Sequence, residues 1–181
     1  MRPHVSILTA WSLALALLAA GFPAAAPAAP TAPPDGTTCF SPDGGCADLL
    51  TGFLGSARAS VDMAIYDLTL DRVARRLAAL RAKGVSVRVL VDRREARWDR
   101  YSRVPRLVEA GVEVRTVDLR GIMHDKFCVV DGREVETGSF NYTRSADRRN
   151  AENQVYLTSP SVVAAFRREF RRLWSRARPL R

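Results

Sequence analysis

The 181-residue chain has few of the residues that most often carry catalysis. It contains two histidines, His4 and His124, three cysteines, and only two lysines, Lys83 and Lys126, among its 28 basic residues. Three cysteines are too few for a fold held together by disulfides. One histidine beyond the N-terminal segment, with no carboxylate cluster around it, leaves a two-metal hydrolytic site without ligands. Any catalytic site must therefore use a small set of side chains.

The composition is otherwise that of a folded, basic domain. Hydrophobic residues make up 47% and charged residues 26%, which excludes disorder and low-complexity architecture for most of the chain. Basic residues outnumber acidic ones by 28 to 19, so the net charge is +9. The length allows one domain with an appendage. A charge of this sign favours a polyanionic partner.

The N-terminal residues have the pattern of an export signal. Arg2 precedes an uncharged stretch over 5–20 that is rich in Leu and Ala, and small residues and prolines follow through Pro34. We therefore expect a secretory signal peptide over residues 1–28, cleaved near 26–28, and an exported or secreted protein. A single membrane anchor is the alternative, but the apolar stretch is shorter than the roughly 20 residues of a span. No other stretch of the sequence is long enough to cross a bilayer.

Two cysteines frame a segment that is rich in turn-forming residues. Cys39 and Cys46 flank Phe-Ser-Pro-Asp-Gly-Gly, which can fold the two ends together. In an oxidising compartment we expect a disulfide between them, and half of a metal site is the alternative. Residues 29–45 are interpreted as a Pro- and Gly-rich leader that carries this loop. Cys128 lies in an apolar run and is expected to be a buried free thiol.

From residue 46 onward, helical and strand patterns alternate. Apolar spacing predicts helices over 47–57, 70–80 and 105–110 and from Ser159 onward, and strands over 61–66, 85–91, 112–117, 127–130, 134–137 and 154–157. Residues 93–103 are interpreted as a polar connection, and Asp131-Gly132 predicts a hairpin turn. The order predicts an α/β fold over 46–181: a single domain with a mixed, largely parallel β-sheet flanked by helices.

One stretch places chemically useful side chains at close spacing. His124 and Lys126 lie two residues apart at a strand start, so their side chains project from one face. Ser139 and Asn141 follow the second strand of the hairpin, which returns the chain toward His124. An imidazole, a cation and several neutral donors together favour a phosphate site. We expect Glu152, at the start of the next strand, to accept the second ring N–H of His124.

These residues match a known signature. His-x-Lys, four residues, Asp131, six residues and Gly138-Ser-x-Asn resembles the signature of the phospholipase D superfamily without a gap, and Asp131 and Gly138 are its structural members. Further segments resemble the small secreted bacterial nuclease branch of that superfamily: Cys39-Phe-Ser-Pro, Ile65-Tyr66, Leu68-Thr69 and Asn150-Ala-Glu-Asn153. Asp67 departs from that branch, which more often has a small polar residue there.

The resemblance implies a phosphodiesterase that needs neither a metal nor a cofactor and works through a covalent phosphohistidine. In that scheme one histidine attacks phosphorus and a second protonates the leaving oxygen. By residue matching, His124 is the nucleophile or the acid, and Glu152 orients it. The residues that bind phosphate are Lys126, Ser139 and Asn141.

The histidine count predicts a dimer. The implied chemistry needs two imidazoles on opposite sides of one phosphorus, and the chain without its signal peptide has only His124. A second copy related by a two-fold axis supplies the other, and the resemblance agrees, since members with one motif pair. We therefore expect a homodimer with its active site at the interface, close to Met123 and Asp125.

The substrate is less directly indicated. Arginines that can hold several phosphates crowd two segments beside the motif: Arg93, Arg94, Arg97, Arg100 and Arg103, and Arg144, Arg148 and Arg149. Trp98 and Tyr142 are expected to stack on bases. These features favour an endonuclease that cleaves nucleic acid. A phospholipid hydrolase with phospholipase D activity and a non-catalytic module that binds phosphate or nucleic acid are the alternatives.

Overall fold

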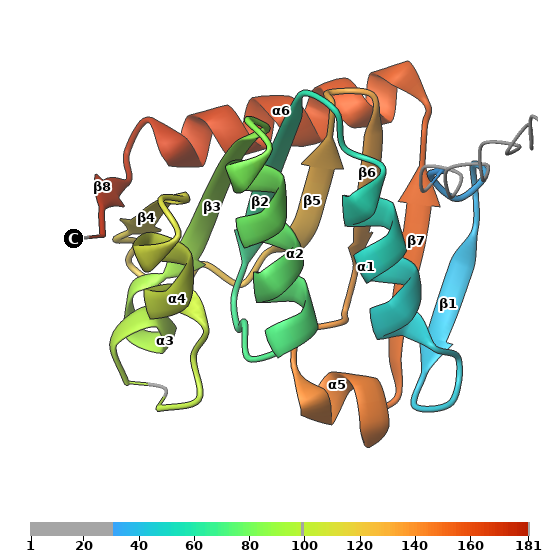
Figure 1. Ribbon diagram of the computed structural model, residues 1–181, viewed down its shortest axis with the longest axis horizontal. Helices are drawn as coiled ribbons and strands as arrows, with labels where there is room; N and C mark the ends of the chain where they lie inside the picture. The colour runs from blue at the N-terminus through green and yellow to red at the C-terminus, as the bar shows by residue number, and fades with distance from the viewer. Residues whose placement is uncertain (1–30, 99, 181) are drawn as a thin grey trace, which may run out of the picture.

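An eight-stranded sheet runs through the centre of the described structure (Figure 1). The computed structural model describes residues 31–98 and 100–180, apart from the side chains of Arg97 and Trp98, so the expected signal peptide over 1–28 lies outside the described residues. Across the sheet the strands follow the order β1-β7-β6-β5-β2-β3-β4-β8. In chain order the elements are β1 (Thr38–Ser41), α1 (Cys46–Gly55), β2 (Ser60–Ile65), α2 (Asp71–Ala82), β3 (Ser86–Asp92), α3 (Arg93–Trp98), α4 (Val104–Glu109), β4 (Glu113–Val117), β5 (Lys126–Val130), β6 (Glu134–Gly138), α5 (Arg144–Arg148), β7 (Glu152–Leu157), α6 (Pro160–Trp174) and β8 (Arg178–Pro179).

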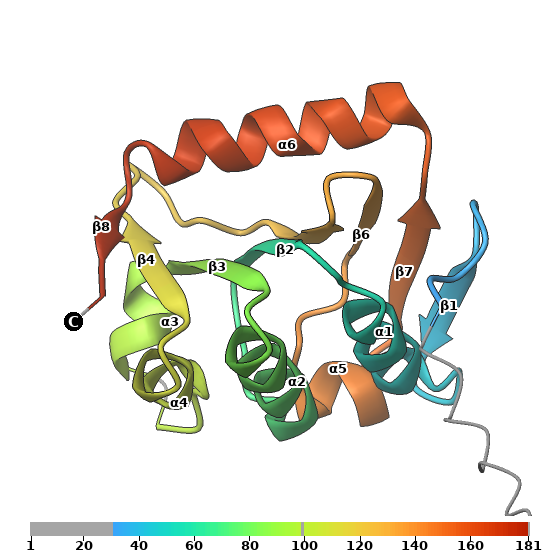
Figure 2. The same cartoon turned by 45° about the horizontal axis from the view of Figure 1, so that its top comes forward.

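Helices cover both faces of the sheet, which gives three layers (Figure 2). Helix α6 lies across one face and contacts β2, β4, β5 and β6. Helices α1, α2 and α4 pack in a row on the opposite face, and α5 lies at the lower edge of the sheet in Figure 1. The predicted α/β class, with one mixed sheet flanked by helices, is confirmed.

Each face of the sheet builds its own hydrophobic core. In β2, Val61, Met63 and Ile65 contribute to the core under α1 and α2, whereas Ala64 contributes to the core under α6. This division follows the two-residue period of a strand. None of the four side chains has exposed surface. Burial on both faces explains why the sequence of β2 is nearly continuously apolar.

The sheet is not largely parallel, so that expectation is wrong. Only β2 with β3 and β3 with β4 pair in parallel, and the other five pairs of described strands are antiparallel. Helices connect the strands of the two parallel pairs, whereas β5 follows β4 without a helix and β6 follows β5 through a turn. Parallel neighbours need a long crossover, usually a helix, whereas the turn between β5 and β6 allows only antiparallel pairing of those two strands.

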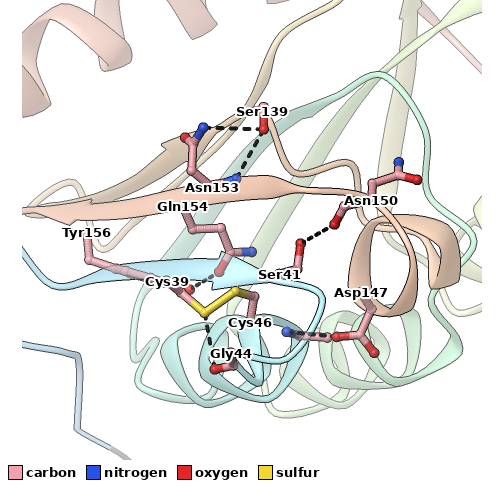
Figure 3. The surroundings of a disulfide bond; sticks show 11 residues. Cys39, Ser41, Gly44, Cys46, Ser139, Asp147, Asn150, Asn153, Gln154 and Tyr156 are labelled. Carbon is pink, nitrogen blue, oxygen red and sulfur yellow. Dashed lines mark hydrogen bonds between the residues drawn. A yellow bond between two sulfur atoms is a disulfide. The ribbon is translucent and has the colours of Figure 1, made fainter.

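The segment before residue 46 belongs to the domain rather than to a separate leader. Strand β1 pairs antiparallel with β7, and Ser41 lies opposite Glu152. A disulfide joins Cys39 in β1 to Cys46 at the start of α1 across a Cα–Cα distance of 5.6 Å (Figure 3). A four-residue strand is too short for its alternation to be recognised in the sequence. The domain boundary expected at residue 46 is corrected accordingly.

Two short helices are absent from the sequence prediction. Helix α3 lies in the segment interpreted as a connection, and α5 follows β6. Each begins beside a side-chain oxygen that accepts a backbone N–H: Asp92 Oδ1 from Arg94 at 2.8 Å, and Thr143 Oγ1 from Ala146 at 3.1 Å. Such caps stabilise a first turn, but helices this short carry no apolar period to detect.

The last long helix, α6, is amphipathic, as its apolar spacing predicts. Val163, Phe170 and Leu173 are buried against the sheet, whereas Arg168 and Arg171 are exposed. Within residues 31–98 and 100–180, neither this helix nor any other is long and apolar enough to cross a membrane.

A carboxyl group is buried in the core beneath α1. Glu136 in β6 is 1% exposed, and its Oε2 accepts hydrogen bonds from the Tyr142 hydroxyl at 2.5 Å and the Cys128 thiol at 3.6 Å. Burial raises the pKa of Glu136 to about 7, although the bonds from Tyr142 and Cys128 act to lower it. The folded protein therefore holds this proton over a pH range in which an exposed carboxyl has lost it.

Glu136 should make the folded state less stable as the pH rises from about 4.5 to about 7. Below that range both the folded and the unfolded state bind the proton, and within it only the folded state does. A pKa that moves from 4.5 to about 7 changes the free energy of unfolding by roughly 3 kcal/mol. In denaturant titrations from pH 4 to pH 8, the free energy of unfolding of the wild type should fall by up to that amount relative to that of Glu136→Gln.

Glu109→Gln is the matched control, because Glu109 is exposed at the end of α4. Its free energy of unfolding should follow that of the wild type across the range. If the difference in free energy of unfolding between wild type and Glu136→Gln did not change with pH, it would contradict a buried, protonated carboxyl.

Candidate active site

The predicted site residues meet at one edge of the sheet, the lower edge in Figure 1. Strands β2 and β3 end there, β5 and β7 begin there, and α5 follows the end of β6. In the strand register, Ile65 lies opposite Lys126 and Gly138 lies opposite Gln154. The carboxyl ends of parallel strands are a common place for ligand sites in open α/β sheets.

His124 and Lys126 are in direct contact. The Lys126 ammonium donates to the His124 carbonyl oxygen at 2.9 Å, and its Nζ lies 3.2 Å from ring Nδ1 and 3.3 Å from ring Nε2. Lys126 is only 8% exposed. Burial lowers the pKa of Lys126, while the negative charges of Glu152 and Asp125 act to raise it. A poorly hydrated ammonium beside an imidazole is arranged to receive an anion.

Tyr66 packs against the histidine ring. The ring centroids of Tyr66 and His124 are 4.6 Å apart in an edge-to-face arrangement. The Tyr66 hydroxyl donates to Glu95 Oε1 at 3.0 Å, and its backbone N–H donates to the carbonyl of Asp125 at 3.0 Å. Tyr66 therefore fixes the ring and the backbone of the His124 segment together.

Asp92 ties the same segment to the end of β3. Its Oδ2 accepts from the backbone N–H of Met123 at 3.0 Å, and its Oδ1 begins α3. Sequence reasoning missed Asp92 and Glu95 as site supports and used Tyr66 only through the family resemblance. A carboxylate that directly ends a buried strand, as Asp92 does, is the signal that identifies such a residue.

A second group of polar residues lies where β6 ends and β7 begins. Ser139 Oγ donates to Glu152 Oε2 at 2.5 Å, and Asn150 Nδ2 donates to Glu152 Oε1 at 2.9 Å. Ser139 Oγ also accepts from the backbone N–H of Asn153 at 3.1 Å (Figure 3). No described hydrogen bond joins Glu152 to His124, so its orienting role stays a prediction.

Of the three other motif residues, Gly138 and Asp131 have local structural roles, whereas the Asn141 side chain has none among the described residues. A Cβ at Gly138 would overlap the carbonyl oxygen of Asn153, so only glycine fits. Asp131 accepts backbone N–H bonds from Arg58, Ala59 and Ser60 at 2.7 to 2.9 Å and so ties the hairpin to the start of β2. The buried Oδ1 of Asn141 has no hydrogen-bond partner among the described residues.

His124 and Lys126, called the reactive pair below for the role proposed for them, line a cavity of about 370 Å³. Of the predicted site residues, His124, Lys126 and Gly138 line it. Phe127 and Phe166 form an apolar wall with ring centroids 5.0 Å apart. The cavity thus combines a cation and an imidazole with apolar surface and with the carboxylates of Asp125 and Glu169.

One expectation for the surroundings of the site is wrong, and others are not tested. Tyr142 cannot stack on a base, because it has no exposed surface and its hydroxyl bonds buried Glu136. Met123 is buried, with 1% of its surface exposed, and its place near a subunit interface stays a prediction. The side chains of Trp98 and Arg97 lie outside the described structure. In the described residues, no three His, Cys, Asp or Glu side chains are grouped so that they could hold a metal ion.

The chain is similar to phospholipase D-like proteins in sequence and in structure. The family model described as cardiolipin synthase, PLD-like domain, matches residues 50–174. A phospholipase D of Rickettsia bellii is 33% identical over 72% of this chain and 64% of its own length. A mitochondrial cardiolipin hydrolase of Chlamydomonas reinhardtii is 36% identical over 67% of this chain and 54% of its own length. The chain thus spans less than two thirds of these relatives. The crystal structure of a phospholipase D family member, Nuc from Salmonella typhimurium, is 31% identical, with a TM-score of 0.75 over 80% of this chain and 97% of that one.

Inorganic phosphate should bind at the reactive pair through Lys126. Removing a charged hydrogen-bond donor typically costs about 1.5 to 3 kcal/mol, so Lys126→Met should raise the Kd for phosphate by roughly tenfold or more. Isothermal titration measures both affinities. Lys83→Met removes the other lysine, an exposed residue after α2, and should leave the affinity unchanged. Equal affinities of the wild type and Lys126→Met would place the anion elsewhere.

Proposed function

The chain belongs to the cardiolipin synthase, PLD-like domain family, and on this premise we propose that it is a phosphodiesterase that forms a covalent bond between His124 and phosphorus. The observation that carries the proposal is the contact of Lys126 Nζ with both ring nitrogens of His124, at 3.2 and 3.3 Å, in the wall of an open cavity. An anion bound by this ammonium has its phosphorus next to an imidazole that can attack it.

The reaction consists of two displacements at phosphorus. A neutral ring nitrogen of His124 attacks, the bond to the leaving oxygen breaks, and a second imidazole gives that oxygen a proton. Water then attacks the phosphohistidine and returns a proton to the second imidazole, which frees His124 and a phosphate monoester. The sum is the addition of one water across one P–O bond. Lys126, with Ser139 and Asn141, stabilises the charge on the phosphoryl oxygens.

The second imidazole comes from another copy of the chain. His124 is the one histidine in residues 31–181, and in-line displacement needs the acid and the nucleophile on opposite sides of phosphorus. A homodimer with a two-fold axis beside the site meets this need. Ile122, two residues before His124, supports an interface beside the site, because its large apolar side chain is 42% exposed.

Nucleic acid is the substrate that the charge distribution favours. The net charge of the chain is +9, and Arg144 and Arg149 are exposed close to the edge of the sheet that holds the reactive pair. Several cations near one reactive phosphate suit a substrate that carries many phosphates. The protein is therefore proposed to be an endonuclease, active without a metal or another cofactor.

A phospholipid is the second candidate, and one observation favours it. The wall formed by Phe127 and Phe166 beside His124 can take apolar parts of a lipid. Two of the relatives are themselves named phospholipase D and cardiolipin hydrolase.

Export from the cytoplasm is part of the proposal. The disulfide between Cys39 and Cys46 supports it, because such bonds persist in oxidising compartments. The sequence pattern over residues 1–28 points to the same destination.

Activity should depend on His124 and survive chelation. Purified protein in excess EDTA is incubated with plasmid, single-stranded RNA, and vesicles of phosphatidylcholine or cardiolipin, and all products are measured. The nucleic acids should be cut and the lipids left intact. His124→Ala should lose turnover, because no other histidine of residues 31–181 can act as the nucleophile. Retention of more than a few per cent of the activity by His124→Ala, or rescue of an EDTA-inhibited enzyme by magnesium, would refute the mechanism. Cleavage of lipid alone would favour the second candidate.

Dimerisation should be required for turnover. Light scattering should report about twice the mass of the chain, and Ile122→Asp should shift the protein to monomers and reduce activity with it. Phe40→Asp is the control, because Phe40 is also exposed, at 65%, but lies in edge strand β1. A strictly monomeric sample with full activity would exclude the two-histidine mechanism.

A further inference from the structure

A second cavity adjoins the reactive site and differs from it in lining. Its volume is about 930 Å³, and its walls include Arg103, Arg144 and Arg149, the exposed Tyr101, and the carboxylates of Asp67 and Glu95. The reaction described above uses none of these groups. Three guanidinium groups around one cavity suit an anion with several oxygens.

Three separate chain segments build this cavity and hold it beside His124. The backbone N–H of Arg103 donates to the carbonyl of Leu68 at 2.9 Å, and the N–H of Tyr142 donates to the carbonyl of Asp67 at 3.1 Å. Glu95 accepts the hydroxyl of Tyr66, whose ring contacts His124. Tyr66 thus connects one wall of the second cavity to His124, so neighbouring units of one polymer can occupy the two places.

Two of the cavity's cations have no partner within the described structure. The side chains of Arg144 and Arg149 are exposed and make no hydrogen bond or ion pair with another described residue. Arg103 is different, because it lies 3.3 Å from Asp71 and donates to the carbonyl of Tyr101 at 3.0 Å. Asp67 and Glu95 also line the cavity, and repulsion by their carboxylates favours an anion bound near Arg144 and Arg149.

An exposed aromatic ring lies next to these cations. Tyr101 is 58% exposed, and the guanidinium of Arg100 lies 4.7 Å from its ring centroid. An exposed ring with a cation beside it is a stacking platform for an unpaired base, whereas a base inside a duplex has no free face to offer.

We propose that this cavity is a nucleotide subsite for a single-stranded polynucleotide, next to the phosphodiester that His124 attacks. The backbone phosphate of the bound nucleotide lies against Arg144 and Arg149, and its base stacks on Tyr101. The inference rests on the proposed function and narrows the substrate to an unpaired strand. It also supplies the stacking residue that buried Tyr142 cannot be.

Binding measurements test the subsite separately from catalysis. All proteins carry His124→Asn to prevent turnover, and the probes are fluorescein-labelled dT12, its duplex with dA12, and phosphatidylglycerol vesicles. Arg144→Gln with Arg149→Gln should weaken dT12 binding about tenfold or more and reduce the slope of log Kd against log salt by about 1.4. Tyr101→Ala should weaken it about tenfold, and Tyr101→Phe should restore it. The duplex should bind more weakly than dT12.

The matched control removes the same charge elsewhere. Arg168→Gln with Arg171→Gln takes two arginines from the exposed face of α6, across the sheet from α2 (Figure 2), and should change the Kd for dT12 less than about twofold. In protein that retains His124, the cavity substitutions should leave hydrolysis of bis(4-nitrophenyl) phosphate, a small diester with no base, unchanged. That result shows that the variants are folded and that the reactive site is intact.

The outcomes separate the subsite from the proposed function. Equal weakening by the α6 control, no effect of Tyr101→Ala, or vesicle binding that depends on the same arginines without dT12 binding would overturn the subsite. If protein with His124 cuts no nucleic acid at all, the proposed function fails, whatever the binding assays show.

Discussion

The contact of the buried Lys126 ammonium with the His124 ring is the interaction on which this edge of the sheet depends. Burial disfavours the charge of Lys126, and the nearby carboxylates Glu152 and Asp125 offset the cost only in part. In the proposed reaction a bound phosphate completes the compensation, because it brings negative oxygens to an ammonium that lacks water. The same burial that is unfavourable for the free protein therefore favours an anionic substrate.

The rest of the fold keeps that pair in place. Lys126 begins β5, its backbone lies opposite Ile65, and its carbonyl accepts the Thr137 hydroxyl at 3.0 Å. On the β7 side, the Ser41 hydroxyl of disulfide-bonded β1 donates to the carbonyl of Asn150 at 3.2 Å (Figure 3). The Asn150 side chain in turn donates to Glu152 Oε1 at 2.9 Å. The edge strand and its disulfide thus support the carboxylate whose charge acts on Lys126. Support from both sides of the sheet gives the preorganisation that phosphoryl chemistry needs.

Local signals in the sequence predicted much of this arrangement, and long-range contacts account for what it missed. Asp131-Gly132 predicts a hairpin, and both residues adopt the positive φ, 51° and 66°, that such a turn requires. The spacing of His124 and Lys126 likewise predicts their contact. By contrast, the roles of Tyr66 and Asp92 depend on which strands become neighbours. The burial of Tyr142 depends on packing around the buried carboxyl of Glu136, which no local pattern marks. Short elements such as β1 and α5 are set by pairing and capping rather than by a period, so pattern analysis does not detect them.

In the proposed reaction a phosphoryl group is transferred to His124 and then to water. Each displacement inverts the configuration at phosphorus, so two in sequence restore it. The direct measurement is the hydrolysis of a P-chiral phosphorothioate dinucleotide in ¹⁸O-labelled water, followed by ³¹P NMR analysis of the product's configuration. Net retention is the result that a phosphohistidine intermediate predicts. Net inversion, which a single attack by water produces, would contradict the account.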